Sequence, residues 1–159
     1  MNVGEILALY RVLGSLTPIR ADCGELCEAA CCKGSDEDGM LLLPGEEKLL
    51  RFSPDLRLKT SQNGRAYAVC NGKCVRALRP FSCRIYPLAI LKDGDNVRIV
   101  ADPRAKYTCP LLKAPEYIDP DFVRALRKAG KLMMKSASGR AYLDSLAEEL
   151  RAYYRFTGK

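Results

Sequence analysis

Apolar side chains near the N-terminus recur at helical spacing. Ile6, Tyr10 and Leu13 lie four and three positions apart, which places them on one face of a helix. We expect this helix to run from Met1 to Leu16 and to end at the Thr17-Pro18 step, because a residue before proline avoids the helical region of backbone space. The pattern predicts an amphipathic helix with one buried face.

The C-terminal part of the chain shows the same spacing twice. Asp119-Pro120 is typical of a helix start, with aspartate as the cap and proline in the first turn. Ser138-Gly139 predicts a break before a final helix. The apolar stripes are Phe122, Leu126, Ala129 and Met133 in the first helix and Tyr142, Leu146, Leu150 and Tyr153 in the second. We therefore expect a C-terminal helical hairpin over residues 119–157.

Between these helices, short apolar runs bounded by turn residues predict strands. Pro44 to Glu47 predicts the start of a short helix, with its acids placed against the helix dipole. Asn71-Gly72 predicts a hairpin within residues 65–75, because both central residues of such a turn need positive φ. Residues 88–101 predict a second hairpin that turns at 93–96. The whole pattern predicts an α+β fold, with small central β-hairpins and loops flanked by N- and C-terminal helices.

The composition adds one unusual feature, eight cysteines and no histidine in 159 residues. All the cysteines lie within residues 21–110, which we expect to form the core of a single domain spanning 1–159. Three explanations of such a set are disulfides, metal ligation, and buried thiols that are unrelated to one another. The start of the chain lacks the pattern of a secretory signal, and no stretch has the roughly 18–20 apolar residues of a membrane span. We therefore expect a cytoplasmic protein without a membrane association, whose reduced thiols bind metal.

The first cysteine cluster consists of Cys23, Cys27, Cys31 and Cys32. On a regular helix Cys23 and Cys31 would lie roughly 12 Å apart along the axis, whereas sulfurs around one zinc lie within roughly 4 Å of each other. Either residues 22–33 therefore form a loop around the metal, or these cysteines serve two centres. The side chains of Cys31 and Cys32 diverge because the residues are adjacent, so one is spare, or the two bind neighbouring centres or different irons of one cluster.

The second cluster consists of Cys70, Cys74 and Cys83, and Cys109 completes the set. Thiols on either side of the Asn71-Gly72 turn suit a metal knuckle. The absence of a C-x2-C spacing and of histidine favours an iron–sulfur cluster, while Zn²⁺ held by four cysteines stays open. Eight cysteines suffice for two four-thiolate centres, but their pairing does not follow from the sequence.

The formal net charge of +7 comes from 26 Lys and Arg against 19 Asp and Glu. If eight thiolates held two divalent ions, the change would be −8 + 4 = −4, leaving +3. Much of the basicity then balances an anionic centre, so we do not expect a nucleic-acid partner. A basic stripe could touch RNA or an acidic partner, but we expect a solvated face that pairs with the acids of the next helix. The stripe is Arg124, Arg127, Lys128, Lys131 and Lys135, and the acids are Asp144, Glu148 and Glu149.

Arg79 and Arg84 lie on either side of Cys83 within the segment 79–87. A guanidinium lowers the pKa of a nearby thiol, so these arginines could stabilise thiolate ligands or donate to the sulfur of a bound cluster. The alternative is ordinary pairing with carboxylates. We expect Tyr86, in the same segment, to be a core residue rather than a catalytic one.

Four features together resemble the YkgJ-type cysteine-cluster family. They are the cysteine-rich start, Leu43-Pro44-Gly45-Glu46-Glu47, Gly72-Lys73-Cys74 and Arg79-Pro80-Phe81-Ser82-Cys83-Arg84-Ile85-Tyr86-Pro87. Members of that family are described as zinc- or iron-chelating domains, and a related module occurs in flagellin lysine N-methylases. The resemblance covers residues 23–109. It implies chelation by Cys23, Cys27, Cys31, Cys32, Cys74 and Cys83, with Cys70 and Cys109 matching by order. The spacing between Cys23 and Cys27 is wider than the corresponding spacing in the family. The segment between Cys74 and Arg79 lacks the tyrosine that relatives often carry there and is one residue shorter than theirs.

We therefore expect a metal-binding protein with one or two thiolate-only centres that hold an iron–sulfur cluster or Zn²⁺. A closed zinc site would make it a structural module for a protein partner, whereas an iron–sulfur cluster can change oxidation state. One alternative is a protein-modifying enzyme, similar to a lysine N-methylase, with an open coordination position or a methyl-donor pocket. Another is metal storage or trafficking, in which a chelator removes metal without unfolding the protein.

Overall fold

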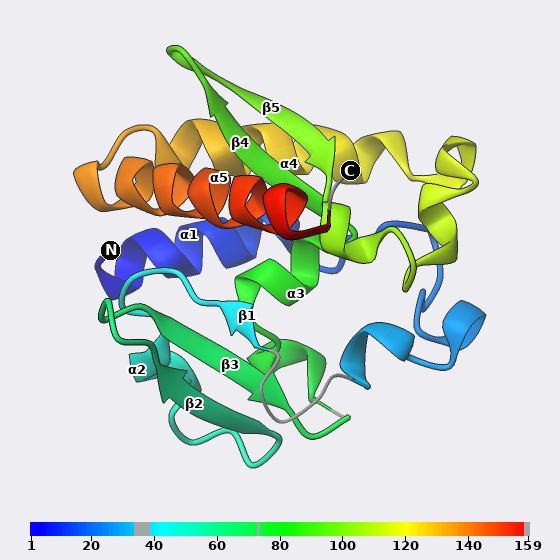
Figure 1. Ribbon diagram of the computed structural model, residues 1–159, viewed down its shortest axis with the longest axis horizontal. Helices are drawn as coiled ribbons and strands as arrows, with labels where there is room; N and C mark the ends of the chain where they lie inside the picture. The colour runs from blue at the N-terminus through cyan, green and yellow to red at the C-terminus, as the bar shows by residue number, and fades with distance from the viewer. Residues whose placement is uncertain (34–38, 73, 158–159) are drawn as a thin grey trace.

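The computed structural model describes residues 1–33, 39–72 and 74–157. It confirms the α+β class, with helices from both ends of the chain around small antiparallel sheets (Figure 1). The helices are α1 Val3–Leu13, α2 Glu47–Leu50, α3 Phe81–Ile85, α4 Pro120–Met133 and α5 Ala137–Thr157. The strands are β1 Met40–Leu41, β2 Leu56–Thr60, β3 Ala66–Cys70, β4 Leu88–Asp93 and β5 Asn96–Ala101. They form one sheet of order β1-β3-β2 and the hairpin β4-β5.

The larger hydrophobic core lies where α1, α4 and α5 meet α3 and the β4-β5 hairpin (Figure 1). Phe81, Phe122 and Leu126 are fully buried in it. A smaller cluster around Leu50 and Leu56 supports the three-stranded sheet. Among the described residues, none between 21 and 33 belongs to either cluster, so the first cysteine cluster lies outside the hydrophobic core.

Helix α1 begins and ends with clear local signals. Asn2 Oδ1 accepts a hydrogen bond from the Glu5 N–H at 2.9 Å, and Glu5 Oε2 accepts one from the Asn2 N–H at 2.8 Å. This reciprocal pair satisfies two N–H groups that a helix start leaves free. The helix ends at Leu13 rather than at Leu16, because Gly14 turns the chain with a φ of +49°.

The predicted hairpin over residues 65–75 is wrong. Strand β3 pairs with β2, which precedes it, and with β1 on its other edge, so Cys70 lies opposite Leu56. The turn that joins the two long strands carries Gly64 at a φ of +75°, within a second Asn-Gly pair. Lys73, part of the predicted return strand, lies outside the described residues. The sequence contains two Asn-Gly pairs that could form a hairpin turn, Asn63-Gly64 and Asn71-Gly72. The structure uses Asn63-Gly64, which has strand sequences on both sides.

The second predicted hairpin is confirmed. Strands β4 and β5 pair from Leu88–Ala101 to Asp93–Asn96, so the turn consists of Gly94 and Asp95. Gly94 has a φ of +58°, which a two-residue hairpin turn requires.

The C-terminal helices form as expected, but the break between them is displaced. The Asp119 side chain accepts a hydrogen bond from the Asp121 N–H and caps α4. Helix α4 ends at Met133, and Ser138 and Gly139 lie inside α5. A Cβ on Gly139 would approach the Met133 carbonyl oxygen to 2.2 Å. The glycine therefore permits a close approach of the two helices instead of ending one.

In the part of the chain that the structure describes, the acidic residues of α5 do not pair with the basic stripe of α4, contrary to expectation. Asp144 pairs with Lys92, Glu148 with Arg65 and Glu149 with Arg104, so the acids join α5 to the sheets and to the turn after β5. The stripe itself is exposed, as predicted. Among the described helices, none is both long enough and apolar enough to cross a membrane.

Candidate metal centre

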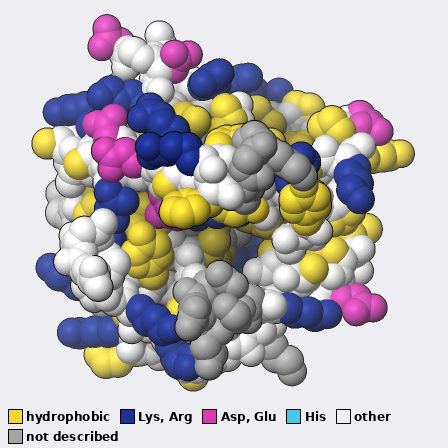
Figure 2. Space-filling model, in the orientation of Figure 1, with side chains coloured by type: hydrophobic (Ala, Val, Ile, Leu, Met, Phe, Trp, Pro, Cys, Tyr) yellow, Lys and Arg dark blue, Asp and Glu magenta, His cyan; other side chains and the backbone are white. Residues whose placement is uncertain are grey.

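Five of the eight cysteines line one cavity of about 540 Å³. They are Cys31, Cys32, Cys70, Cys74 and Cys83. The cavity is bounded by the end of β3, helix α3, the cysteine-rich loop and Tyr153 of α5. Figure 2 shows a hollow near the centre of this face of the molecule, rimmed by hydrophobic and basic side chains. Segments far apart in the sequence therefore deliver thiols to one place.

Two of these cysteines lie in packed secondary structure, and a third is held by a hydrogen bond. Cys70 ends β3, where it pairs with Leu56 of β2. Cys83 lies in α3, between Phe81 and Ile85, both buried in the larger core. Cys74 follows β3, and its Sγ accepts a hydrogen bond from Arg79 Nε at 3.4 Å.

Helix α3, which carries Cys83, is held by a buried carboxylate. Glu46 is completely buried, and its Oε1 accepts hydrogen bonds from the Phe81 N–H at 2.7 Å and from the Tyr10 hydroxyl at 2.5 Å. Its Oε2 accepts a third from the Leu43 N–H at 2.8 Å. One side chain thus joins α1, the turn before α2 and the start of α3. Sequence reasoning treated Glu46 as a helix-start acid and missed this role, which depends on contacts with distant residues.

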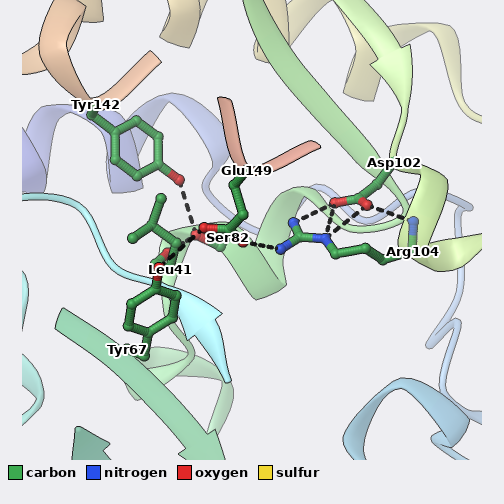
Figure 3. Close-up of polar contacts among 7 residues, drawn as sticks. All are labelled: Leu41, Tyr67, Ser82, Asp102, Arg104, Tyr142 and Glu149. Carbon is green, nitrogen blue, oxygen red and sulfur yellow. Dashed lines mark hydrogen bonds and ion pairs between the residues drawn. The ribbon is translucent and has the colours of Figure 1, made fainter. Parts of the chain in front are cut away.

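A second polar contact holds α3 from its other side. The Ser82 hydroxyl donates to the Leu41 carbonyl and lies 3.0 Å from the Tyr142 hydroxyl of α5 (Figure 3). Ser82 precedes Cys83, so the position of the thiol depends on β1 and α5 as well as on its own helix.

The two arginines beside Cys83 have different partners. Arg79 contacts sulfur directly, as described above. Arg84 donates hydrogen bonds to the carbonyls of Arg79, Arg76 and Ala77, and its guanidinium stacks 4.2 Å from the centre of the Tyr10 ring. Arg84 therefore fixes the turn between Cys74 and α3, whereas Arg79 supplies positive charge at a thiol.

The first cysteine cluster is a loop, not a straight helix. It consists of two short 3₁₀ turns, Glu25–Cys27 and Ala30–Cys32. Between them Glu28 and Ala29 have φ values of 49° and 54°. A left-handed conformation costs roughly 1–2 kcal/mol for each residue with a side chain. The bend turns Cys31 and Cys32 back toward the rest of the protein, with their Sγ atoms 4.0 Å apart.

Cys109 lies between two short turns near the other end of the cysteine-rich region. Its N–H donates to the Ala105 carbonyl at 2.8 Å, and Ala105 is fully buried. Cys109 is therefore anchored, although it does not line the main cavity.

The electrostatic neighbours of each thiol divide the cysteines into two groups. Burial raises the pKa of Cys83, and so do the neighbouring Cys32, Cys74 and Cys70. Burial likewise raises the pKa of Cys70, with Cys32 and Cys74 again as neighbours. These four residues, Cys32, Cys70, Cys74 and Cys83, are called the core-held group below.

The remaining cysteines have each other as neighbours. Burial and Asp22 raise the pKa of Cys23, with Cys109 and Cys27 contributing. Burial raises the pKa of Cys109, and Cys27 adds to the effect. Cys31 contacts Cys32, which lowers the pKa of Cys31, while burial and the neighbouring Cys27, Cys23 and Cys83 raise it, so Cys31 lies next to both groups. Cys23, Cys27, Cys31 and Cys109 are called the loop-held group below.

The chemistry of the donors fits a metal ion or cluster, although the ligand set is not fully assembled. All eight thiols are free. Among the described residues, no three Cys, Asp or Glu side chains lie close enough to hold one ion. No carboxylate is among the described residues that line the cavity, so its donors are thiols beside the positive charge of Arg79. Thiolates of this kind bind Zn²⁺ and iron–sulfur clusters once the sulfurs draw together.

One wall of the cavity, which includes Arg104, Tyr86 and Tyr153, did not follow from the sequence. Arg104 pairs with Asp102 at 2.6 Å and with Glu149 of α5 at 2.5 Å (Figure 3). Tyr67 of β3 donates its hydroxyl to the same Glu149. Tyr86, expected in the core, is only half-buried and also faces the cavity. The wall therefore joins α5 to both sheets.

No protein-family model, curated protein or solved structure matches this chain. The resemblance to the cysteine-cluster family thus rests on the quoted motifs alone and stays a hypothesis.

Proposed function

We propose that this chain is a metal-binding protein with two thiolate-only centres, one formed by the core-held group and one by the loop-held group. The supporting observations are the cavity that five of the thiols line and the electrostatic neighbours of each thiol, among which Cys31 is next to both groups. In this arrangement Cys31 and Cys32 feed neighbouring centres, which resolves the difficulty of placing adjacent thiols on one ion.

Each centre would hold Zn²⁺ or an iron–sulfur cluster. A closed four-cysteine zinc site would stabilise the fold, whereas an iron–sulfur cluster would supply a change of oxidation state. Arg79, at Cys74, would offset part of the thiolate charge in the core-held group. Both options require reduced thiols, in keeping with a cytoplasmic location.

A second candidate, a protein-modifying enzyme similar to a lysine N-methylase, is favoured by the cavity itself. Arg104, Tyr86 and Tyr153 line it together with the thiols. At about 540 Å³, the space falls within the usual range of about 300–1,000 Å³ for small-molecule sites. A co-substrate beside a metal centre would need such a space. Metal storage or trafficking would instead need a metal that leaves without unfolding.

The decisive experiment is anaerobic purification followed by elemental analysis and an absorption spectrum of the same sample. Stoichiometric iron with broad visible absorbance would assign iron–sulfur clusters, and colourless protein with zinc would assign structural sites. Protein that contains neither metal, and binds neither on reconstitution, would refute the proposal.

A further inference from the structure

The two cysteine groups differ in how the rest of the fold holds them. We propose that the loop-held group is an exchangeable metal site, which releases and regains its metal while the core-held group keeps its own. This inference rests on the proposed function, because it concerns the order in which two thiolate centres lose metal.

The segment that supplies most of the loop-held group has no core of its own. None of the described residues 21–33 is buried, and Leu26 is 59% exposed. A thiol on such a segment is located mainly by the metal that it binds. Loss of the metal then frees the segment without exposing any buried apolar surface.

The backbone hydrogen bonds of this segment are also local, although the Cys32 side chain is hydrogen-bonded to Cys70 of β3. Among the described residues, its backbone bonds run within the segment, such as Ala29 N–H to the Gly24 carbonyl and Cys32 N–H to the Ala29 carbonyl, both 2.8 Å. An ion pair within the segment joins Lys33 to Glu28. Such bonds maintain the turns but do not attach them to the sheets or helices.

The core-held group, in contrast, is held by contacts with the sheets and helices of the main fold. Cys70 is fixed by strand pairing, and Cys83 by the contacts of Phe81 with Glu46 and of Ser82 with Tyr142. These two ligands therefore remain in place when metal leaves. A competing chelator must then displace metal from preorganised ligands, which slows release.

The position of Cys31 gives an incoming ligand a route to the exchangeable metal. Its side chain is exposed, and it is the loop-held residue that also lines the cavity. An acceptor that carries thiols, either a protein or a small thiol, can take metal one sulfur at a time from this side. The loop-held group is therefore suited to pass its metal to a thiol-bearing partner.

Zinc release from the full chain tests this inference. The reduced protein is loaded with Zn²⁺ alone under anaerobic conditions and mixed with an excess of chromogenic chelator. We expect two phases of equal amplitude, separated in rate by about tenfold or more. Cys27→Ser should abolish the fast phase and leave the slow one, and the matched variant Cys70→Ser should do the reverse.

Hydrogen exchange on the unmodified protein gives a readout that does not depend on how the variants fold. After the fast phase, amides of residues 22–30 should exchange faster, while Cys32 stays bound in the core-held group and the amides of 66–70 and 81–85 stay protected. Release of both zinc ions in a single phase, or loss of protection in β3 and α3 together with the loop, would overturn the inference but leave metal binding intact. A chain that binds no zinc and contains no iron would overturn the proposed function and, with it, this inference.

Discussion

The core-held and loop-held groups contain the same number of cysteines but differ in their surroundings. The core-held group draws on strand pairing, a buried glutamate and a helix packed in the main core. The loop-held group takes three of its four thiols from a segment without buried residues, and only Cys109 is anchored. On the proposed function, the two groups would therefore hold metal with different firmness despite having the same ligand type. The difference would come from the ordering of the backbone, because each residue fixed on binding costs roughly 1–2 kcal/mol of conformational entropy.

The largest effect should come from Cys83→Ser. The variant should lose one metal equivalent and about 4 kcal/mol in its free energy of unfolding, at free metal about a thousandfold above its Kd. Elemental analysis and urea unfolding in buffered metal measure both quantities.

The matched control for this change is Cys27→Ser, which makes the same atomic substitution in the loop-held group. It should also lose one metal equivalent, but with a smaller decrease in the free energy of unfolding, because no packed element depends on it. Equal losses of stability in the two variants would contradict the comparison, and full metal content in Cys83→Ser would remove that residue from the ligand set.

The next effect should come from Glu46→Ala. The change leaves the N–H groups of Phe81 and Leu43 without their acceptor in a buried setting, and each such group costs about 1–3 kcal/mol. We expect the free energy of unfolding to fall by about 2–5 kcal/mol. Slow-phase zinc release should become faster while the fast phase is unchanged. Lys48→Ala, an exposed neighbour, serves as the control, and an unaltered slow phase in Glu46→Ala would show that α3 does not preorganise the site.

A smaller effect should follow from Arg79→Gln. Loss of the guanidinium at Cys74 removes a charged donor to a ligand, and such changes reduce metal affinity by about 10–100-fold. Competition with a chelator of known affinity measures this change. The matched variant Arg84→Gln should instead lower the melting temperature, because Arg84 binds carbonyls and not sulfur. The same affinity change in both variants would contradict the separate roles assigned to the two arginines.

The smallest effect should be that of Lys131→Glu on the exposed face of α4. Metal content and both phases of zinc release should stay unchanged, and the free energy of unfolding should move by no more than about 0.5 kcal/mol. Circular dichroism and elemental analysis suffice as measurements. A change in metal content would show that the basic face influences the centres over a long range.

Local patterns predicted the parts of the fold that depend on local physics. Helical spacing located α1, α4 and α5, and the turn at Gly94 located the β4-β5 hairpin. The prediction failed where two local signals competed, as with the Asn-Gly pairs, and where Gly139 served a contact between helices. It also missed the pairing of the α5 acids, whose partners lie more than 40 positions away along the chain.

The sequence by itself determined the donor chemistry, eight thiols without histidine, and the impossibility of a straight helix around one ion. Only the tertiary structure decided which thiols are neighbours, because Cys32 meets Cys70 and Cys83 through the folding of distant segments. It also decided that Glu46 and Ser82 anchor one group while the other stays outside the core. The spacing of cysteines along the sequence limits which nearby thiols can bind one metal ion. Burial and contacts between distant segments arise only when the chain folds.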